Sequence, residues 1–147
     1  MYQRILVATD GSKLSKKAVD DAIALAASLG AELIALKVVP RYPQSYFEGS
    51  MPLSVDEVAR VEQHWADDGH EVVEAVKRAG AVKGVKVKPI IARSDVVSDA
   101  LIAAAKKHKA DLIVMASHGR SGLRKLLLGS QAQAVVSRGS LPVLVVR

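Results

Sequence analysis

The chain has 147 residues and a mass of 15.6 kDa, which is enough for one domain with a core of its own. Half of the residues are apolar but only 3% are aromatic, and cysteine is absent. The core must therefore be aliphatic, and disulfides, thiol catalysis and cysteine-ligated zinc are excluded. A first strand is expected over residues 3–9 and a second over 32–39. Between them, apolar residues at helical spacing predict a helix over Lys13–Leu29 that Gly30 ends.

The segment over residues 40–52 is an irregular loop that holds three of the five prolines. A loop of this kind can be a lid, an interface or simply mobile, and the sequence leaves these open. Ser54 and Glu57 then form a capping-box pattern, which predicts a helix that ends before Gly80. We interpret Trp65 inside this helix as a packing residue rather than a ligand platform, because nothing else in the helix forms a site.

The second half of the chain continues the alternation. Residues 84–92 predict a strand whose lysines and Pro89 favour the edge of a sheet, and a helix is expected from Ser94 and Asp95 up to Lys106, Lys107 and Lys109. The apolar run Leu112–Ala116 is typical of a strand buried on both faces. A helix over residues 130–138, ended by Gly139, and a strand over residues 141–146 complete the chain.

Five strands alternating with four helices predict an α/β fold, in which one open parallel sheet carries helices on both faces. Ligands in such folds bind at the carboxyl ends of the strands. The net charge of +6 is scattered along the chain without interleaved aromatic residues, which argues against a dedicated nucleic-acid role. No apolar run approaches the ~20 residues of a membrane span, so a cytoplasmic protein is expected.

The stretch from Asp111 to Gln131 carries the clearest functional pattern, namely a strand, a glycine-containing loop and a helix start. Glycines allow the backbone to approach a ligand closely, and the N–H groups at a helix start favour an anion. Gly119, Gly122 and Gly129-Ser130 therefore indicate a phosphate site. Taken singly, each of them could equally be an ordinary turn or an ordinary helix cap.

At these residues the chain resembles the universal stress protein family, specifically its ATP-binding branch. The family pattern is Gly, two residues, Gly, nine residues, Gly and then Ser or Thr. Here Gly119, Gly129 and Ser130 match it, while Ala116 replaces the first glycine. The opening ILVATDGS, the ADLIVMASHG strand and loop and the closing PVLVV also look like family hallmarks, so the resemblance covers essentially the whole chain as a single domain, residues 1–147.

The resemblance implies a Rossmann-like sheet of order 3-2-1-4-5 and a homodimer formed through the last strand, Val143–Val146. It also implies ATP as ligand, with Mg²⁺ reaching the phosphates from Asp10. The nucleotide-binding residues that it implies are Ala8, Thr9, Asp10, Val38, Met115, Ala116, His118, Gly119, Arg120, Ser121, Gly122, Gly129, Ser130, Gln131 and Ala132.

The expected function is that of a nucleotide-dependent regulatory protein of the stress response. Asp10 could instead cap the first helix, and His118 is interpreted as a structural residue or a neighbour of the phosphates rather than a catalytic one. Hydrolysis of ATP should be slow at most, since no general base is evident. Ala116 favours an alternative, a nucleotide-free dimer that acts as an interaction module. A phospho-acceptor domain fits poorly, because Asp10 lacks the second carboxylate and the other partners that this chemistry needs.

Overall fold

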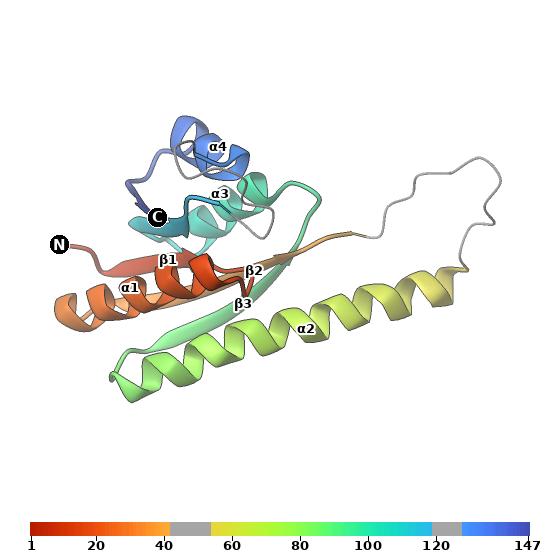
Figure 1. Ribbon diagram of the computed structural model, residues 1–147, viewed down its shortest axis with the longest axis horizontal. Helices are drawn as coiled ribbons and strands as arrows, with labels where there is room; N and C mark the ends of the chain where they lie inside the picture. The colour runs from red at the N-terminus through yellow and green to blue at the C-terminus, as the bar shows by residue number, and fades with distance from the viewer. Residues whose placement is uncertain (42–53, 119–127) are drawn as a thin grey trace.

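The computed structural model describes residues 1–41, 54–118 and 128–147, so nearly all of the loop expected over residues 40–52 lies outside the described part. Strands and helices alternate along the chain as predicted (Figure 1). The strands are β1 (Arg4–Ala8), β2 (Glu32–Val39), β3 (Val87–Arg93), β4 (Leu112–Ala116) and β5 (Val143–Val146). The helices are α1 (Lys13–Leu29), α2 (Val55–Val82), α3 (Val97–Lys107) and α4 (Ser130–Arg138).

All five strands are parallel and form one sheet of order β3-β2-β1-β4-β5, which confirms the order implied by the family resemblance. The chain first builds outward from β1 to β3 and then crosses back to add β4 and β5 on the other side of β1. The strand order therefore reverses between β1 and β4. At such a switch point the loops after the two strands diverge and leave room for a ligand.

Two apolar clusters hold the helices on opposite faces of the sheet. One face packs against α1 and α2 and includes Ile5 and Val7, whereas the other packs against α3 and α4 and includes Leu6 and Leu101. Figure 1 shows α3 and α4 together on one side and α2 on the other. Every residue of β4 is buried, which confirms a strand covered on both faces. Among the described residues, no helix combines the length and the apolar character needed to cross a bilayer.

The expected edge position of β3 is confirmed, and its backbone explains the proline. The Lys86 carbonyl accepts the Leu33 N–H at 2.9 Å, so this carbonyl points toward β2. Backbone groups alternate in direction along a strand, so the Pro89 nitrogen points away from the sheet. A residue without an N–H therefore costs the sheet no hydrogen bond there.

The helix ends follow the predicted signals in two places. Gly30 closes α1 in the left-handed region, with φ of 66°. Ser54 and Glu57 form the complete capping box of α2, because the Ser54 Oγ accepts the Glu57 N–H at 3.2 Å and the Glu57 carboxylate accepts the Ser54 N–H at 3.0 Å. Both local patterns act within a few residues, and both were therefore readable from the sequence.

The predicted start of α3 was two to three residues early. The helix begins at Val97, with Val96 as its N-cap. Ser94 instead accepts the Val96 N–H with its hydroxyl at 3.1 Å, and the Asp95 carboxylate accepts the Arg41 N–H at 3.2 Å. Both polar side chains serve the turn after β3 rather than the helix, which is the usual competition between Ser or Asp side chains and helical hydrogen bonds.

The predicted end of α2 before Gly80 was wrong, since the helix continues to Val82. Gly80 is buried, and a Cβ atom there would overlap Cγ2 of Val87 on β3. Gly69 lies eleven residues earlier on the same helical face, where a Cβ would come within 2.9 Å of Val39 Cγ1. These two glycines let α2 pack closely on β2 and β3, so they serve packing rather than helix termination.

We expect Gly80→Ala to destabilise the protein by about 1 kcal/mol, although alanine is the better helix former by a similar amount. The overlap with the stiff Val87 side chain outweighs the gain in propensity. Urea unfolding measures the change. Ala75→Gly, on the exposed face of the same helix, is the control and should also destabilise. If Gly80→Ala were stabilising, the close contact would be wrong.

Candidate functional site

β1 ends in a tight turn that leads directly into α1. Gly11 has a φ of 80°, a conformation in which any side chain is strained, so this turn requires glycine. The buried Thr9 accepts the Gly11 N–H with its hydroxyl at 3.2 Å, and the same oxygen lies 3.2 Å from Ser15 Oγ. Ser12 is the N-cap of α1 and accepts the Ser15 N–H at 3.2 Å. The hydroxyl of Thr9 is thus used inside the protein, and only its backbone can face a ligand.

Asp10 lies in this turn at the carboxyl edge of the sheet. Its Oδ1 accepts the Ser12 N–H at 2.9 Å, so it supports the turn while Ser12 itself caps the helix. Burial raises the pKa of the Asp10 carboxyl, but the hydrogen bonds from Ser12 and Ser15 and the charge of Lys37 outweigh it and hold the pKa below its usual value. Asp10 therefore carries a full negative charge at neutral pH.

The end of β4 and the start of α4 meet at Ser117. The Ser117 N–H donates to the Val146 carbonyl at 2.8 Å, and its own carbonyl accepts the Gly129 N–H at 2.8 Å. A Cβ atom on Gly129 would lie 2.8 Å from that same Ser117 oxygen and 3.5 Å from His118 Cα. The chain thus leaves the sheet at His118 and returns next to it at Gly129, in a contact that only glycine fits.

The first turn of α4 lies at the carboxyl edge of the sheet, beside the end of β4. Gly129 is the N-cap, and no side chain in the described part of the chain caps this turn. A helix of this length has an N-terminus that favours an anion, through free N–H groups and the positive end of the helix dipole. Ser130 is the first residue of the helix and adds a hydroxyl at this end.

The side chains of Gln131 and Ala132 point elsewhere. The Gln131 side-chain oxygen accepts the Ser98 N–H at the start of α3 at 2.8 Å, and Ala132 is 2% exposed within the core. Arg138 adds further contacts between the helices, at 2.7 Å to Ser98 Oγ and 2.9 Å to the Asp99 carboxylate. Gln131 and Ala132 can therefore meet a ligand only through their backbone, while their side chains fix α4 to α3 and to the sheet.

Three of the predicted residues form an apolar surface on the α3–α4 face of the sheet. Ala8, Val38 and Met115 come from β1, β2 and β4, and all three pack on the same apolar cluster. Ala8 and Val38 are only half-buried. Ala116 differs, because its methyl group belongs to the cluster on the α1–α2 face and is 9% exposed. The methyl of Ala116 thus points away from the surface that Ala8, Val38 and Met115 share.

Comparison with known proteins decides the family. The profile of the universal stress protein family matches the chain over residues 1–147. The chain belongs to the universal stress protein family. It is 36% identical over 149 residues to universal stress protein MJ0531 of Methanocaldococcus jannaschii, with 100% of this chain and 83% of that protein covered. It is 33% identical over 149 residues to universal stress protein YxiE of Bacillus subtilis, with both chains fully covered.

A solved universal stress protein in complex with cAMP is also similar to this chain. The two share 30% sequence identity and superpose with a TM-score of 0.73, covering 99% of this chain and 97% of the other. The fold of this universal stress protein is therefore that of its solved relatives over its whole described length.

Several of the predicted site residues fall outside the described part of the chain, namely Gly119, Arg120, Ser121 and Gly122. His118 lies at its boundary, with Nδ1 3.1 Å from the Ser117 hydroxyl. Within residues 1–41, 54–118 and 128–147 no three His, Asp or Glu side chains gather as a metal site. A single carboxylate such as Asp10 suits Mg²⁺ only when phosphate oxygens supply further ligands, which is the usual mode for this ion.

The prediction from sequence missed Ser15, Ser117 and Lys37. The Ser15 hydroxyl lies within hydrogen-bonding distance of Thr9 in the turn after β1, and the backbone of Ser117 forms hydrogen bonds with Val146 of β5 and with Gly129. The charge of Lys37 helps to lower the pKa of Asp10. Ser15 stands three residues after Ser12, which is the spacing of a capping interaction, so that signal was available. Ser117 and Lys37 act across the sheet, and no local pattern marks them.

Proposed function

We propose that this universal stress protein binds ATP, with Mg²⁺, at the carboxyl edge of its sheet and acts as a nucleotide-dependent regulatory protein in the cytoplasm. The observation that carries the proposal is the contact of Gly129 with Ser117, which sets an uncapped helix N-terminus beside the switch point between β1 and β4. The solved relative with cAMP supports an adenine nucleotide as the ligand class.

Each part of the edge suits one part of the nucleotide. The first turn of α4 would bind phosphate oxygens through the Ser130 hydroxyl and the N–H groups that follow Gly129, together with Gly119 to Gly122. The half-buried Ala8 and Val38 offer an apolar surface for the base. Asp10, ionised at neutral pH, would repel the phosphates directly, so a bound Mg²⁺ between them is the favourable arrangement.

The regulatory mechanism we propose is occupancy sensing. A nucleotide at this edge would contact both the turn after β1 and the start of α4. Binding would then order the two relative to one another and favour one arrangement of the surfaces that meet a partner. This mechanism needs no hydrolysis, and we propose slow turnover at most.

We also propose a homodimer that forms through β5. This strand is an edge of the sheet, and Leu144 is 41% exposed on it. An edge strand with apolar side chains offers both backbone hydrogen bonds and apolar area to a second copy. Its neighbour Ser117 links β5 to the start of α4, so an interface there would lie next to the nucleotide.

The proposal is tested by extracting nucleotide from the purified protein and by titrating ATP, with and without Mg²⁺, in isothermal calorimetry. We expect ATP to bind more tightly with Mg²⁺ than without it. cAMP is the matched competitor, because it has the same base and sugar but no phosphate chain for Mg²⁺ to bridge. Absence of bound nucleotide together with no binding at millimolar ATP would falsify the proposal.

The variant Ala116→Gly separates this proposal from a nucleotide-free interaction module. The Ala116 methyl lies on the α1–α2 face, so we expect its removal to change ATP affinity less than about fivefold and mainly to reduce stability by about 1 kcal/mol. Val114→Ala, in the same strand and the same cluster, is the control for loss of packing alone. A large gain in ATP affinity for Ala116→Gly would instead show that the methyl excludes the nucleotide.

A further inference from the structure

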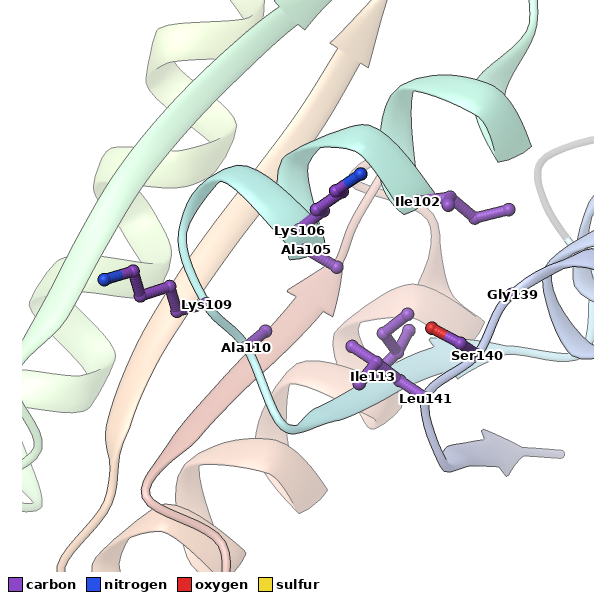
Figure 2. A pocket seen from close by; sticks show the side chains of 9 residues that line it. All are labelled: Ile102, Ala105, Lys106, Lys109, Ala110, Ile113, Gly139, Ser140 and Leu141. Atoms are coloured by element: carbon purple, nitrogen blue, oxygen red, sulfur yellow. The ribbon is translucent and has the colours of Figure 1, made fainter.

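A hollow of about 320 Å³ lies at the opposite end of the sheet from the proposed nucleotide site. It is bounded by the end of α3 and by the chain that connects α4 to β5. Figure 2 shows the side chains of Ile102, Ala105, Ile113 and Leu141 around it, with the Ser140 hydroxyl at its border. Ala105 and Ile113 are almost fully buried, so the bottom of the hollow is apolar.

Two lysines, Lys106 and Lys109, line this hollow, and two more, Lys88 and Lys107, act on the neighbouring His108 at the end of α3. We call these four lysines the basic rim. All four are exposed, and within the described residues no carboxylate forms an ion pair with any of them. The nearby Glu32 is already bound to Arg4 and Lys86. The rim is therefore a concentration of positive charge that the protein itself does not compensate.

The rim is drawn from two elements that are distant in sequence. Lys88 lies on β3, while Lys107 belongs to the last turn of α3. Both charges act on His108 at the end of α3, whose pKa is lowered by burial, then by Lys88 and then by Lys107. Repulsion between these groups is a cost that an anionic partner would remove.

The position of Lys109 is not explained by helix stability. Lysines in the last turn of a helix complement its dipole, which accounts for Lys106 and Lys107. Lys109 follows the helix and has a φ of 56°, a conformation that is unfavourable for a lysine and natural for a glycine. Figure 2 shows its ammonium group directed away from the hollow. The positive charge of Lys109 therefore lies at the border of the hollow, and the apolar bottom remains open to an apolar group of a ligand.

We propose that the hollow and the basic rim together form a docking site for an acidic, extended segment of a partner protein that inserts one aliphatic side chain into the hollow. Carboxylates on either side of that side chain would meet the lysines. None of the described residues that line the hollow is aromatic, so they offer no stacking platform for a nucleic-acid base. A half-open recess of this size with an apolar bottom fits a single side chain better than the flat surface of a membrane.

The test measures binding of a fluorescent peptide in which glutamates surround a single leucine, using fluorescence anisotropy. We expect saturable binding that weakens with salt, and about tenfold weaker binding when serine replaces the leucine. Lys88→Gln combined with Lys107→Gln should weaken binding about fivefold. The control, Lys13→Gln combined with Lys16→Gln, removes the same amount of charge from the first turn of α1 and should leave the affinity unchanged.

Two further variants separate docking from general electrostatics. Lys109→Gly should stabilise the fold, because glycine favours the positive φ, and yet weaken peptide binding. Ser140→Trp should block the hollow, so that the leucine peptide and the serine peptide bind with equal affinity. Ser140→Ala should leave the difference between the two peptides unchanged.

Three results would overturn the proposal. The first is no peptide binding at all. The second is that an oligothymidine or phosphatidylglycerol vesicles bind more tightly than the peptide does and that Ser140→Trp leaves this binding unchanged. That result would assign the rim to a nucleic acid or a membrane. The third is loss of a homodimer in Ser140→Trp, which would show that a second copy of this chain covers the hollow.

Discussion

Gly129→Ser is expected to destabilise the protein by about 2 kcal/mol, although serine normally caps a helix better than glycine does. The Cβ of any side chain at Gly129 would lie 2.8 Å from the Ser117 carbonyl oxygen. That oxygen belongs to backbone held by β5 through the Val146 carbonyl, so it cannot move aside cheaply. The start of α4 must then shift away from β4 and lose the hydrogen bond from the Gly129 N–H to Ser117. Urea unfolding measures the loss of stability.

The matched control exchanges the same two residues in the opposite direction at another helix start. Ser54 caps α2 in an exposed capping box, so Ser54→Gly should also destabilise, by a few tenths to about 1 kcal/mol. Serine is thus favoured at one cap and glycine at the other. If Gly129→Ser stabilised the protein, the close approach of α4 to Ser117 would be contradicted.

ATP affinity of Gly129→Ser should fall at least about tenfold, since the N–H groups of α4 are displaced.

The sequence predicted the fold through local patterns, and it failed where a distant element decides the outcome. Gly30 and the Ser54–Glu57 box ended and began helices as expected, because each acts on its own neighbours. Gly80 carried the same terminating signal and was misassigned, because Val87 packs against it from β3. The order of the strands came from the family resemblance, since alternation alone fixes the class of fold and leaves the order open.

The same distinction applies to the site. The turn at Asp10 and the helix start at Gly129 were predicted, and the structure brings both to the carboxyl edge of the sheet. The close contact of Gly129 with Ser117 was not predictable, because the two residues meet only when α4 packs back on β4. The hydrogen bond from the Ser98 N–H of α3 to the Gln131 side chain was not predictable either. Some residues that were predicted as ligand contacts thus have structural contacts within the protein, and a variant at such a position also changes stability.

Asp10→Asn is expected to remove the Mg²⁺ dependence of ATP binding while leaving the fold intact. The asparagine oxygen can still accept the Ser12 N–H that Asp10 accepts at 2.9 Å, so the turn is preserved and only the charge is lost. We expect affinity for Mg²⁺-ATP to fall roughly 10- to 100-fold, the range of one charge-assisted contact. Affinity for ATP without Mg²⁺ should rise, because the repulsion between carboxylate and phosphate is gone. Calorimetry with and without Mg²⁺ measures both.

The pH dependence of the Asp10→Asn effect tests the charge state of Asp10 directly. The hydrogen bonds from Ser12 and Ser15 and the charge of Lys37 outweigh burial and hold the Asp10 pKa below its usual value. The carboxylate therefore stays ionised over roughly pH 5 to 8 and gains a proton only as the pH falls through that lowered pKa. Mg²⁺ is kept in excess so that ATP stays in its Mg²⁺ complex at every pH, and any remaining change in the ligand is then the same for both proteins. We expect the ratio of their affinities to stay constant over that range, whereas a ratio that approached one toward pH 5 would mean that burial prevails and the pKa is raised instead.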